Sequence, residues 1–183
     1  MVSIRKYKNT DREGVRFVCL NSEGAPHTGN LGEFILHTFC DYYIDKEPEN
    51  CFVLSDDGKT VGYIICTENY DAYKEIFDRE YLHLNKNLGD ELYKWAEEST
   101  VLQEKYKAEY PAHLHIDILP EYQRKGWGGK LVEALSGHLK QKGICGVMLT
   151  AGADNENAGR FYRKYGFEEL EILGTDVAFG KKL

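Results

Sequence analysis

The chain contains two kinds of apolar pattern, one in which apolar residues run together or alternate, and one in which they recur every three or four positions. The first pattern predicts β-strands and the second predicts amphipathic helices. Two apolar runs around Asp56-Asp57-Gly58 predict a hairpin. The predicted strands are 2–7, 51–54, 61–66, 113–119, 144–150, 168–173 and 176–179. The first predicted helix begins after the possible caps Thr10 and Asp11 and runs to Leu20. The other predicted helices are 31–43, 71–81, 88–107, 131–139 and 155–165.

Composition restricts the class of protein to which these elements belong. Hydrophobic residues make up 42% of the 183 residues and charged residues 29%, which is typical of a soluble globular protein. No apolar run approaches the ~18 residues of a membrane span, and Met1–Asp11 contains no apolar signal core. We expect no membrane association and a cytoplasmic location. No repeat, low-complexity stretch or linker divides the chain, so we expect one domain over 1–183.

Cysteines and charge narrow the possible partners. The five cysteines form no Cys-x-x-Cys pair, so we expect buried thiols in a reducing compartment and neither a disulfide framework nor a zinc site. The net charge of −7 argues against nucleic acid as the main partner. The same charge favours a cationic substrate, although acidity also simply keeps proteins soluble.

The stretch Gln123-Arg124-Lys125-Gly126-Trp127-Gly128-Gly129-Lys130 lies between a predicted strand and a predicted helix. Glycines let backbone N–H groups approach a ligand, and the first turn of a helix attracts anions. The stretch therefore predicts a phosphate cradle. It lacks the Gly and the Ser or Thr of a Walker loop, and Leu131 occupies the third small position of a dinucleotide fingerprint. A glycine-rich turn without a ligand remains the alternative.

A second motif follows at Asn155 to Phe167. It reads Asn-x-x-Ala-x-x-Phe-Tyr-x-Lys-x-Gly-Phe, and Tyr162 lies seven residues after Asn155. Asp154 or Asn155 can cap a helix that Gly166 ends. Judged by spacing alone, Tyr162 belongs to a core aromatic stripe. Together, the Gln-x-x-Gly-x-Gly turn and this second motif resemble the two signatures of the GNAT superfamily, the CoA-dependent N-acyltransferases.

This resemblance implies a GNAT-type fold, which is a mixed, mostly antiparallel central sheet with splayed central strands, flanked by helices. It implies an N-acetyltransferase that moves an acetyl group from acetyl-CoA to a primary amine of a small molecule or protein, by direct attack through a tetrahedral intermediate. No metal is implied. The resemblance also implies that Tyr162 protonates the leaving thiolate and contacts the coenzyme. The other implied coenzyme-binding residues are Ile116, Ile118, Gln123, Arg124, Lys125, Gly126, Trp127, Gly128, Gly129 and Asn155.

Three polar residues interrupt an otherwise apolar strand, which places His113, His115 and Asp117 on the face opposite Leu114, Ile116 and Ile118. Polar groups in a central strand need partners or a cavity. We expect His115 and Asp117 to supply the general base, because the attacking amine must lose a proton. A metal site and a hydrogen-bonded core network without chemistry are the alternatives.

The segment of about 68–111 departs from the family pattern, since many relatives join the hairpin to the next strand by a short turn. It contains six of the thirteen tyrosines and Trp95. Long connections are often binding loops or lids, so we expect this helical insertion to shape the acceptor pocket. A structural flap or a dimer contact is the alternative, and monomer and homodimer both remain open. A catalytically silent acyl-CoA-binding module and a domain that binds no CoA are the alternative functions.

Overall fold

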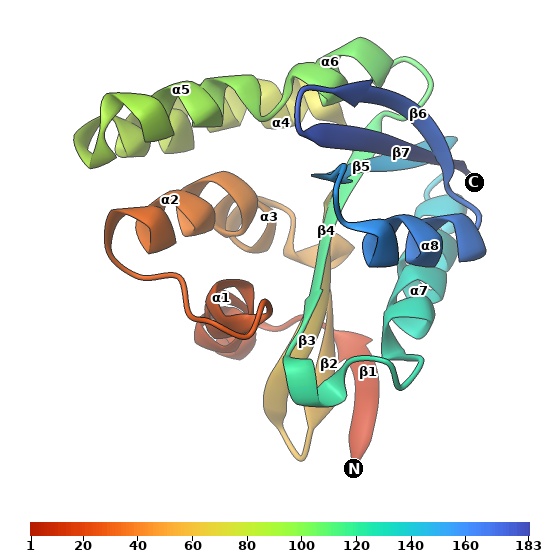
Figure 1. The fold of residues 1–183 in the computed structure, drawn as a ribbon. Coiled ribbons are helices and arrows are strands. Elements are labelled where there is room, and N and C mark those ends of the chain that lie inside the picture. Colours follow the sequence, from red (N-terminus) through yellow and green to blue (C-terminus); the bar gives the residue numbers. More distant parts are fainter.

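One seven-stranded sheet forms the centre of the molecule in a computed structural model that describes all 183 residues (Figure 1). The strand order is β1-β2-β3-β4-β5-β7-β6. Every neighbouring pair is antiparallel except β4 and β5, which are parallel. The predicted mixed, mostly antiparallel sheet is confirmed. The strands are β1 (Val2–Lys6), β2 (Phe52–Asp56), β3 (Lys59–Thr67), β4 (Ala112–Ile118), β5 (Gly146–Gly152), β6 (Glu168–Leu173) and β7 (Asp176–Lys182).

The two parallel strands separate soon after they meet. They pair only at Ala112–Val147 and His113–Met148. The opposite edge of β4 stays paired with β3 from His113 to Ile118. The rest of β4 therefore has an edge toward β5 that pairs with no strand, and its backbone groups there are available to a ligand. This is the splay of central strands that the sequence resemblance implied.

Helices cover both faces of the sheet. Figure 1 shows α1, α2 and α3 on one side of β4, with α7 and α8 on the other. Helix α7 packs on the sheet through Leu131, Leu135 and Leu139, which are buried at the helical spacing that predicted them. No helix is both long and apolar enough to span a membrane. The helices are α1 (Arg12–Asn21), α2 (Gly29–Phe39), α3 (Asp41–Lys46), α4 (Tyr70–Ile76), α5 (Asp90–Glu98), α6 (Val101–Tyr106), α7 (Trp127–Gln141) and α8 (Glu156–Lys164).

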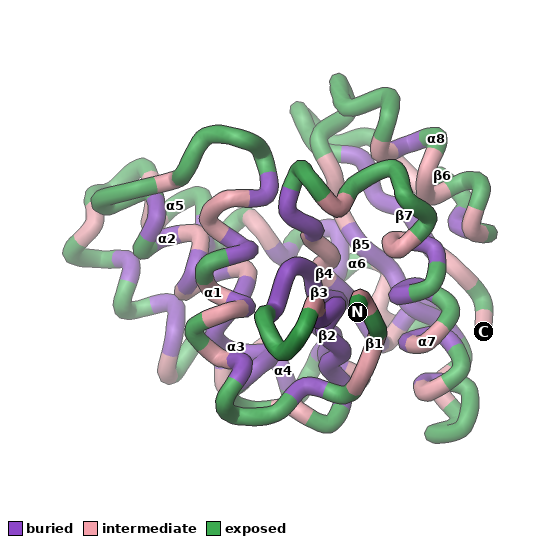
Figure 2. The backbone as a smooth tube through the Cα atoms, turned by 90° about the horizontal axis from the view of Figure 1, so that it is seen from below, coloured by how far each residue is buried: buried purple, intermediate pink, exposed green.

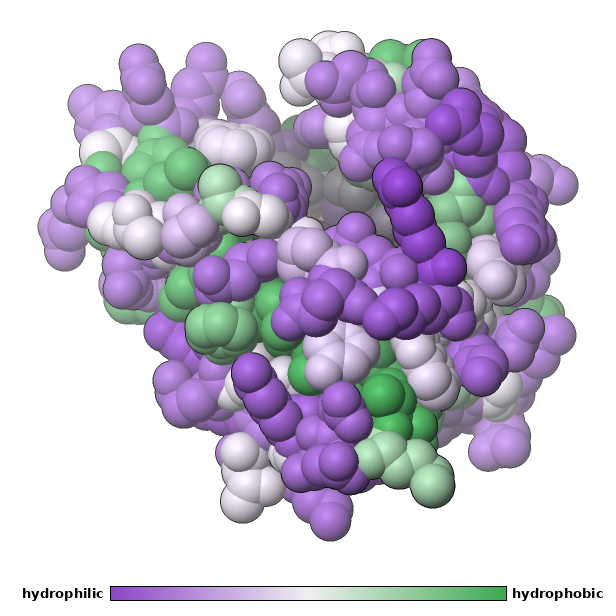
Figure 3. Space-filling view, turned by 60° about the horizontal axis from the view of Figure 1, so that its bottom comes forward, coloured by the Kyte–Doolittle hydropathy of each residue, from purple (hydrophilic) through white to green (hydrophobic).

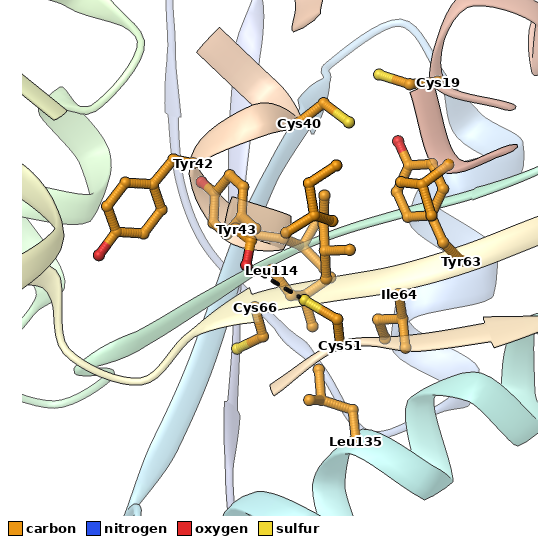
Figure 4. Close-up of a cluster of buried hydrophobic side chains, with 14 of the residues drawn as sticks. Cys19, Cys40, Tyr42, Tyr43, Cys51, Tyr63, Ile64, Cys66, Leu114 and Leu135 are labelled. Carbon is orange, nitrogen blue, oxygen red and sulfur yellow. Dashed lines mark hydrogen bonds between the residues drawn. The ribbon is translucent and has the colours of Figure 1, made fainter. Parts of the chain in front are cut away.

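The core lies on the central strands and is rich in tyrosine. Figure 2 shows buried residues gathered along β2, β3 and β4, with exposed residues on the loops around them. Tyr43 and Tyr63 are wholly buried. Figure 4 shows them beside buried cysteines, and the Cys51 thiol donates a hydrogen bond to the Tyr43 carbonyl oxygen at 3.5 Å. The expectation of five buried thiols is wrong for Cys145, which is exposed because β5 begins after it, at Gly146.

The segment 68–111 is helical but more broken than predicted. The expected helix 88–107 is two helices, α5 and α6, because the chain turns at Ser99-Thr100. The Ser99 hydroxyl donates to the Ala96 carbonyl at 2.8 Å, which is the local competition by which serine ends helices. Helix α5 packs on α2, where the Trp95 and Phe34 rings lie 4.6 Å apart. The expected helix 71–81 is α4 followed by a π-helical turn at Phe77–Tyr81.

Candidate functional site

A groove of about 870 Å³ lies where β4 and β5 separate. Its walls come from the end of β4, the turn before α7, the first turn of α7, helix α8 and the loop after α1. Figure 3 shows a hollow in the molecule between the part that carries α1 and α2 and the part that carries α8. The lining residues are Ser22, Glu23, Gly24, Ile116, Asp117, Ile118, Pro120, Gln123, Arg124, Gly126, Gly128, Gly129, Asn155, Asn157, Ala158, Phe161, Tyr162, Lys164 and Tyr165.

The turn before α7 presents unused backbone donors to this groove. The N–H groups of residues 124–129 donate to no protein acceptor at hydrogen-bonding geometry, and the first bond of the helix runs from the Lys130 N–H to the Gly126 carbonyl at 3.4 Å. Gly126 has a φ of 83°, and Arg124 has a φ of 58°, which non-glycine residues rarely adopt. Six consecutive free amides at the positive end of a 15-residue helix can donate hydrogen bonds to an anion.

The remaining glycines of the motif let helix α8 approach. A Cβ built at Gly128 would lie 3.0 Å from the Phe161 ring, and a Cβ built at Gly129 would overlap the Tyr165 ring and hydroxyl. The Phe161 and Tyr165 rings pack on each other with their centroids 4.9 Å apart. Gly128 and Gly129 of the first motif therefore pack directly against Phe161 and Tyr165 of the second, at the contact between α7 and α8.

Gly129→Ala tests this contact, with Gly137→Ala as its matched control in the same helix. We expect Gly129→Ala to lower the free energy of unfolding by about 1–3 kcal/mol, because the Tyr165 ring must leave its position. A Cβ at Gly137 meets no atom within 4 Å, so Gly137→Ala should raise the free energy of unfolding by about 0.4–1 kcal/mol. Urea unfolding measures both. Equal stability of the two variants would show that Tyr165 does not need this space.

Gln123 holds the turn to the rest of the site. Its Nε2 donates to the Ile118 carbonyl oxygen at 2.7 Å and to the Ser22 carbonyl oxygen at 3.0 Å. The side chain therefore joins the end of β4, the turn and the loop after α1. Gln123 was predicted as a coenzyme contact. It lines the groove, and its donors are occupied by these two backbone oxygens.

Helix α8 carries Asn155 and Tyr162 into the groove. The Asn155 side chain caps the helix by accepting a hydrogen bond from the Ala158 N–H at 3.0 Å. The Tyr162 ring packs against Phe167 and Phe179, at 5.7 and 5.3 Å between centroids. No protein group hydrogen-bonds to its hydroxyl, and burial raises the pKa of Tyr162 above its ordinary value, with a smaller contribution from the Asp117 charge. The phenol stays protonated and free to donate at neutral pH.

Asp117 lies near the same end of the groove. The Tyr63 hydroxyl donates to its Oδ2, and the nearby Ser22 side chain also favours the ionised carboxylate. Burial raises the pKa of Asp117 to about 6, against the lowering effect of these two neighbours. The carboxylate is therefore mostly ionised at neutral pH and is a much stronger proton acceptor than an exposed aspartate.

His115 and His113 point from the same face of β4 into an aromatic cluster. Both Nε2 atoms lie within hydrogen-bond distance of the Tyr43 hydroxyl, at 3.1 Å from His115 and 2.9 Å from His113. The Phe39 ring lies 5.4 Å from the His115 ring. Burial lowers the pKa of His115 to about 4 and lowers the pKa of His113 well below its ordinary value, so both are neutral at pH 7.

The structure gathers most of the predicted site residues around one groove. His115, Lys125 and Trp127 are the predicted residues outside its lining, and no residue of 68–111 lines it. The sequence reasoning missed Tyr63 and the loop residues Ser22, Glu23 and Gly24. Strand register was the signal for Tyr63, because it pairs with Asp117 across β3 and β4. No sequence pattern marks Ser22, Glu23 and Gly24 as groove residues, because only the folded chain brings this loop to the groove.

The hydrogen-bond donors of the groove suit acetyl-CoA. The free amides of residues 124–129 suit a pyrophosphate, and the unpaired edge of β4 suits a chain that carries amide groups, such as pantetheine. Asn155 keeps its Nδ2 free of protein partners while its Oδ1 caps α8. The Tyr162 hydroxyl lies in the same lining. No group of three or more metal-ligating side chains is found.

Comparison with known proteins gives consistent matches. The family model described as "Acetyltransferase (GNAT) family" matches residues 18–167. A mycothiol acetyltransferase of Kocuria rhizophila is 40% identical over 57 residues, which are 31% of this chain and 19% of that protein, so the chain spans about a fifth of this relative's length. The crystal structure of SsHAT has a TM-score of 0.86 and 28% identity, over 99% of this chain and 98% of that one. The PaiA N-acetyltransferase of Thermoplasma acidophilum, solved with coenzyme A, has a TM-score of 0.63 and 18% identity, over 100% of this chain and 99% of that one.

Proposed function

The chain belongs to the acetyltransferase (GNAT) family, and from that premise we propose that it transfers an acetyl group from acetyl-CoA to a primary amine. One observation supports this proposal most strongly. Four residues with free amides, the end of the unpaired edge of β4, Tyr162 and Asp117 all line a single groove. A groove with these groups can hold the coenzyme and act on both the amine and the thiolate.

In this proposal the coenzyme supplies an acetyl group activated as a thioester. The amides of residues 124–129 bind its pyrophosphate, and Arg124 and Lys125 add positive charge nearby. The backbone of Ile116 and Ile118 pairs with the pantetheine arm as an added strand would. The Asn155 side-chain amide forms a hydrogen bond with the pantetheine side of the coenzyme. Trp127 opens α7 and lies under the Lys130 ammonium, which is 4.3 Å from its ring, so it orients charge at the helix start.

Asp117 is the proposed general base. An amine of pKa ~10 is almost wholly protonated at neutral pH, so its proton must be removed before attack. A carboxylate whose pKa is about 6 accepts that proton directly or through water. The sequence also suggested His115. Its pKa of about 4 and the engagement of its Nε2 with Tyr43 favour Asp117 over His115.

Tyr162 is the proposed general acid, and it donates its phenolic proton to the departing thiolate. A backbone N–H near Ile118 stabilises the negative charge that develops on the carbonyl oxygen during attack. Both groups belong to rigid elements, Tyr162 to α8 and Ile118 to β4. Their mutual position therefore does not depend on a mobile loop.

Thermal unfolding with acetyl-CoA and a free-thiol assay with a panel of amines test the proposal together. Acetyl-CoA at 100 times its dissociation constant should add about 2.7 kcal/mol of stability, and amines should release free thiol. Stabilisation without thiol release from any amine would indicate a silent acyl-CoA-binding module. No stabilisation at saturating acetyl-CoA would contradict both functions.

A further inference from the structure

The charged residues that line the groove are divided by sign between its walls. Arg124 comes from the turn before α7 and Lys164 from α8, whereas Asp117 comes from β4 and Glu23 from the loop after α1. Figure 1 shows α1 on the side of β4 opposite α7 and α8. A coenzyme that carries phosphates is attracted to the cationic wall, where the free amides also lie. The acidic wall is therefore left for the acceptor.

Glu23 has no permanently charged cation beside it. Its side chain is 76% exposed, and its ion-pair partner is the His27 imidazole, whose Nε2 lies 3.2 Å from a carboxylate oxygen. An imidazole neutralises a carboxylate only while it is protonated, unlike the side chain of an arginine or a lysine. The Glu23 carboxylate can therefore pair with a positively charged ligand in the groove.

The loop holds Glu23 close to Asp117. Ser22 precedes Glu23 in the chain, and its side chain lies near the Asp117 carboxylate. The Ser22 carbonyl oxygen accepts a hydrogen bond from Gln123 Nε2 at 3.0 Å. Further along the loop, the His27 N–H donates to a carbonyl oxygen of α1 at 2.9 Å. Burial is the main cause of the raised pKa of Asp117, and the Glu23 charge adds to it, so the two carboxylates interact.

We propose that Glu23 is an acceptor-binding residue that pairs with a second positive charge on the acceptor, so that the groove selects amines that carry another cationic group. This inference rests on the proposed function, since it names the acceptor class of the same groove. The two carboxylates then have different tasks. Asp117 takes the proton of the amine that attacks, and Glu23 holds the group that stays charged.

A terminal diamine satisfies both carboxylates, because one amino group loses its proton while the other keeps it. In extended diaminobutane the two nitrogens are five bonds apart, about 6 Å, and a hydrogen bond at each end adds about 2.9 Å. Such a molecule can therefore bridge carboxylates up to about 12 Å apart, which exceeds the ~10 Å over which exposed charges interact in physiological salt. A monoamine engages only Asp117. A lysine side chain beside the amine of a peptide supplies the same second charge.

Paired acceptors test the inference at pH 8. The terminal diamines of propane, butane and pentane are each compared with the monoamine of the same length, and alanyl-lysine amide is compared with alanyl-norleucine amide. In the wild-type protein, the charged member of at least one pair should have the higher kcat/KM per amino group, by about two- to fivefold, because one partly exposed ion pair is added. Glu23→Gln keeps the size of the side chain and should remove most of this preference, mainly through KM.

Glu33→Gln is the matched control. Glu33 forms the same i,i+4 pair with a histidine, His37, at 3.6 Å, and it does not line the groove. The preference for the charged member should keep its wild-type value in Glu33→Gln. Preference within the diamine pairs assigns the second charge to a free diamine, and preference within the peptide pair alone assigns it to a peptide. A wild-type protein that prefers the charged member of no pair, or a preference that persists in Glu23→Gln, overturns the inference.

Calorimetry separates a failure of this inference from a failure of the proposed function. If the amines are acetylated without any preference for a second charge, the proposed function stands and the inference is wrong. If no amine is acetylated, the proposed function is wrong, and titration of the same pairs into the protein saturated with coenzyme A decides the inference. Tighter binding of a charged member, lost in Glu23→Gln and kept in Glu33→Gln, supports it. Equal binding within every pair contradicts it.

Discussion

Replacement of Tyr162 by phenylalanine is expected to lower the rate of acetyl transfer by about 10²- to 10⁴-fold, the usual contribution of a positioned general acid. The change removes only the hydroxyl, which has no hydrogen bond to the protein. The ring contacts with Phe167 and Phe179 stay in place. The loss should therefore appear in kcat, with little change in the melting temperature or in the dissociation constant of acetyl-CoA.

A matched control separates catalysis from a general effect of losing a tyrosine hydroxyl. Tyr106 is on α6 and does not line the groove. Its hydroxyl donates a hydrogen bond to the Glu171 carboxylate at 2.9 Å. Tyr106→Phe should keep wild-type kinetics. Steady-state kinetics and isothermal titration with acetyl-CoA measure both variants. If Tyr162→Phe binds acetyl-CoA normally and turns over as fast as wild type, Tyr162 is not the acid.

The second large effect concerns Asp117. The rate of the wild-type enzyme should rise with pH through about 6 and then level, because the base is active when it has lost its proton. Asp117→Asn should lose about 10²- to 10⁴-fold in kcat/KM at pH 8 and lose this step in the pH profile. A profile of kcat/KM between pH 5 and 9 measures both effects. An unchanged step in Asp117→Asn would assign the titration to another group.

Tyr63→Phe gives a readout that a structural role alone would not produce. The Tyr63 hydroxyl donates to the Asp117 carboxylate and so favours its ionised form. Without that donor the pKa of Asp117 should rise further, and the midpoint of the pH profile should move upward from about 6. A midpoint that moves downward or stays in place would contradict the assignment of Asp117 as the base.

Asp117→Asn should also stabilise the fold at high pH. The pKa of Asp117 is raised from 3.8 in the unfolded chain to about 6 in the folded protein. The folded state therefore gains stability from this group below pH 3.8 and loses that contribution as the pH rises through about 6. Removing the charge should raise the free energy of unfolding at pH 8 by up to about 3 kcal/mol, and less to the extent that solvent reaches the carboxylate. Urea unfolding at pH 8 measures this gain.

Local sequence determined much of the fold. The hairpin around Asp57-Gly58 forms as the turn residues predict, with Asp57 and Gly58 at positive φ. Asn155 caps α8, and Gly166 follows its end at a φ of 84°. The two motifs also indicated the family from sequence alone, because each depends on residues a few positions apart. Such features follow from local backbone preferences and short hydrogen bonds.

Other features were not visible along the chain. The helical insertion does not line the groove. It packs on α2 instead, where the Trp95 ring contacts the Phe34 ring. The pKa of Asp117 depends on burial and on Tyr63 and Ser22, which come from other elements. The His115 ring meets the hydroxyl of Tyr43, which lies 72 residues away in the sequence. A sequence pattern cannot measure burial or the approach of distant side chains.

By itself, the sequence determined the turn with its free amides, the capped helix that carries Tyr162, and the alternation that puts His115 and Asp117 on one face of a strand. Only the tertiary structure decided that β4 and β5 part, that the two motifs meet through Gly129 and Tyr165, and that Asp117 titrates near pH 6. The reason is physical. Helix caps, turns and alternation arise from neighbouring residues, whereas proton affinity and cavity shape arise from groups that folding brings together.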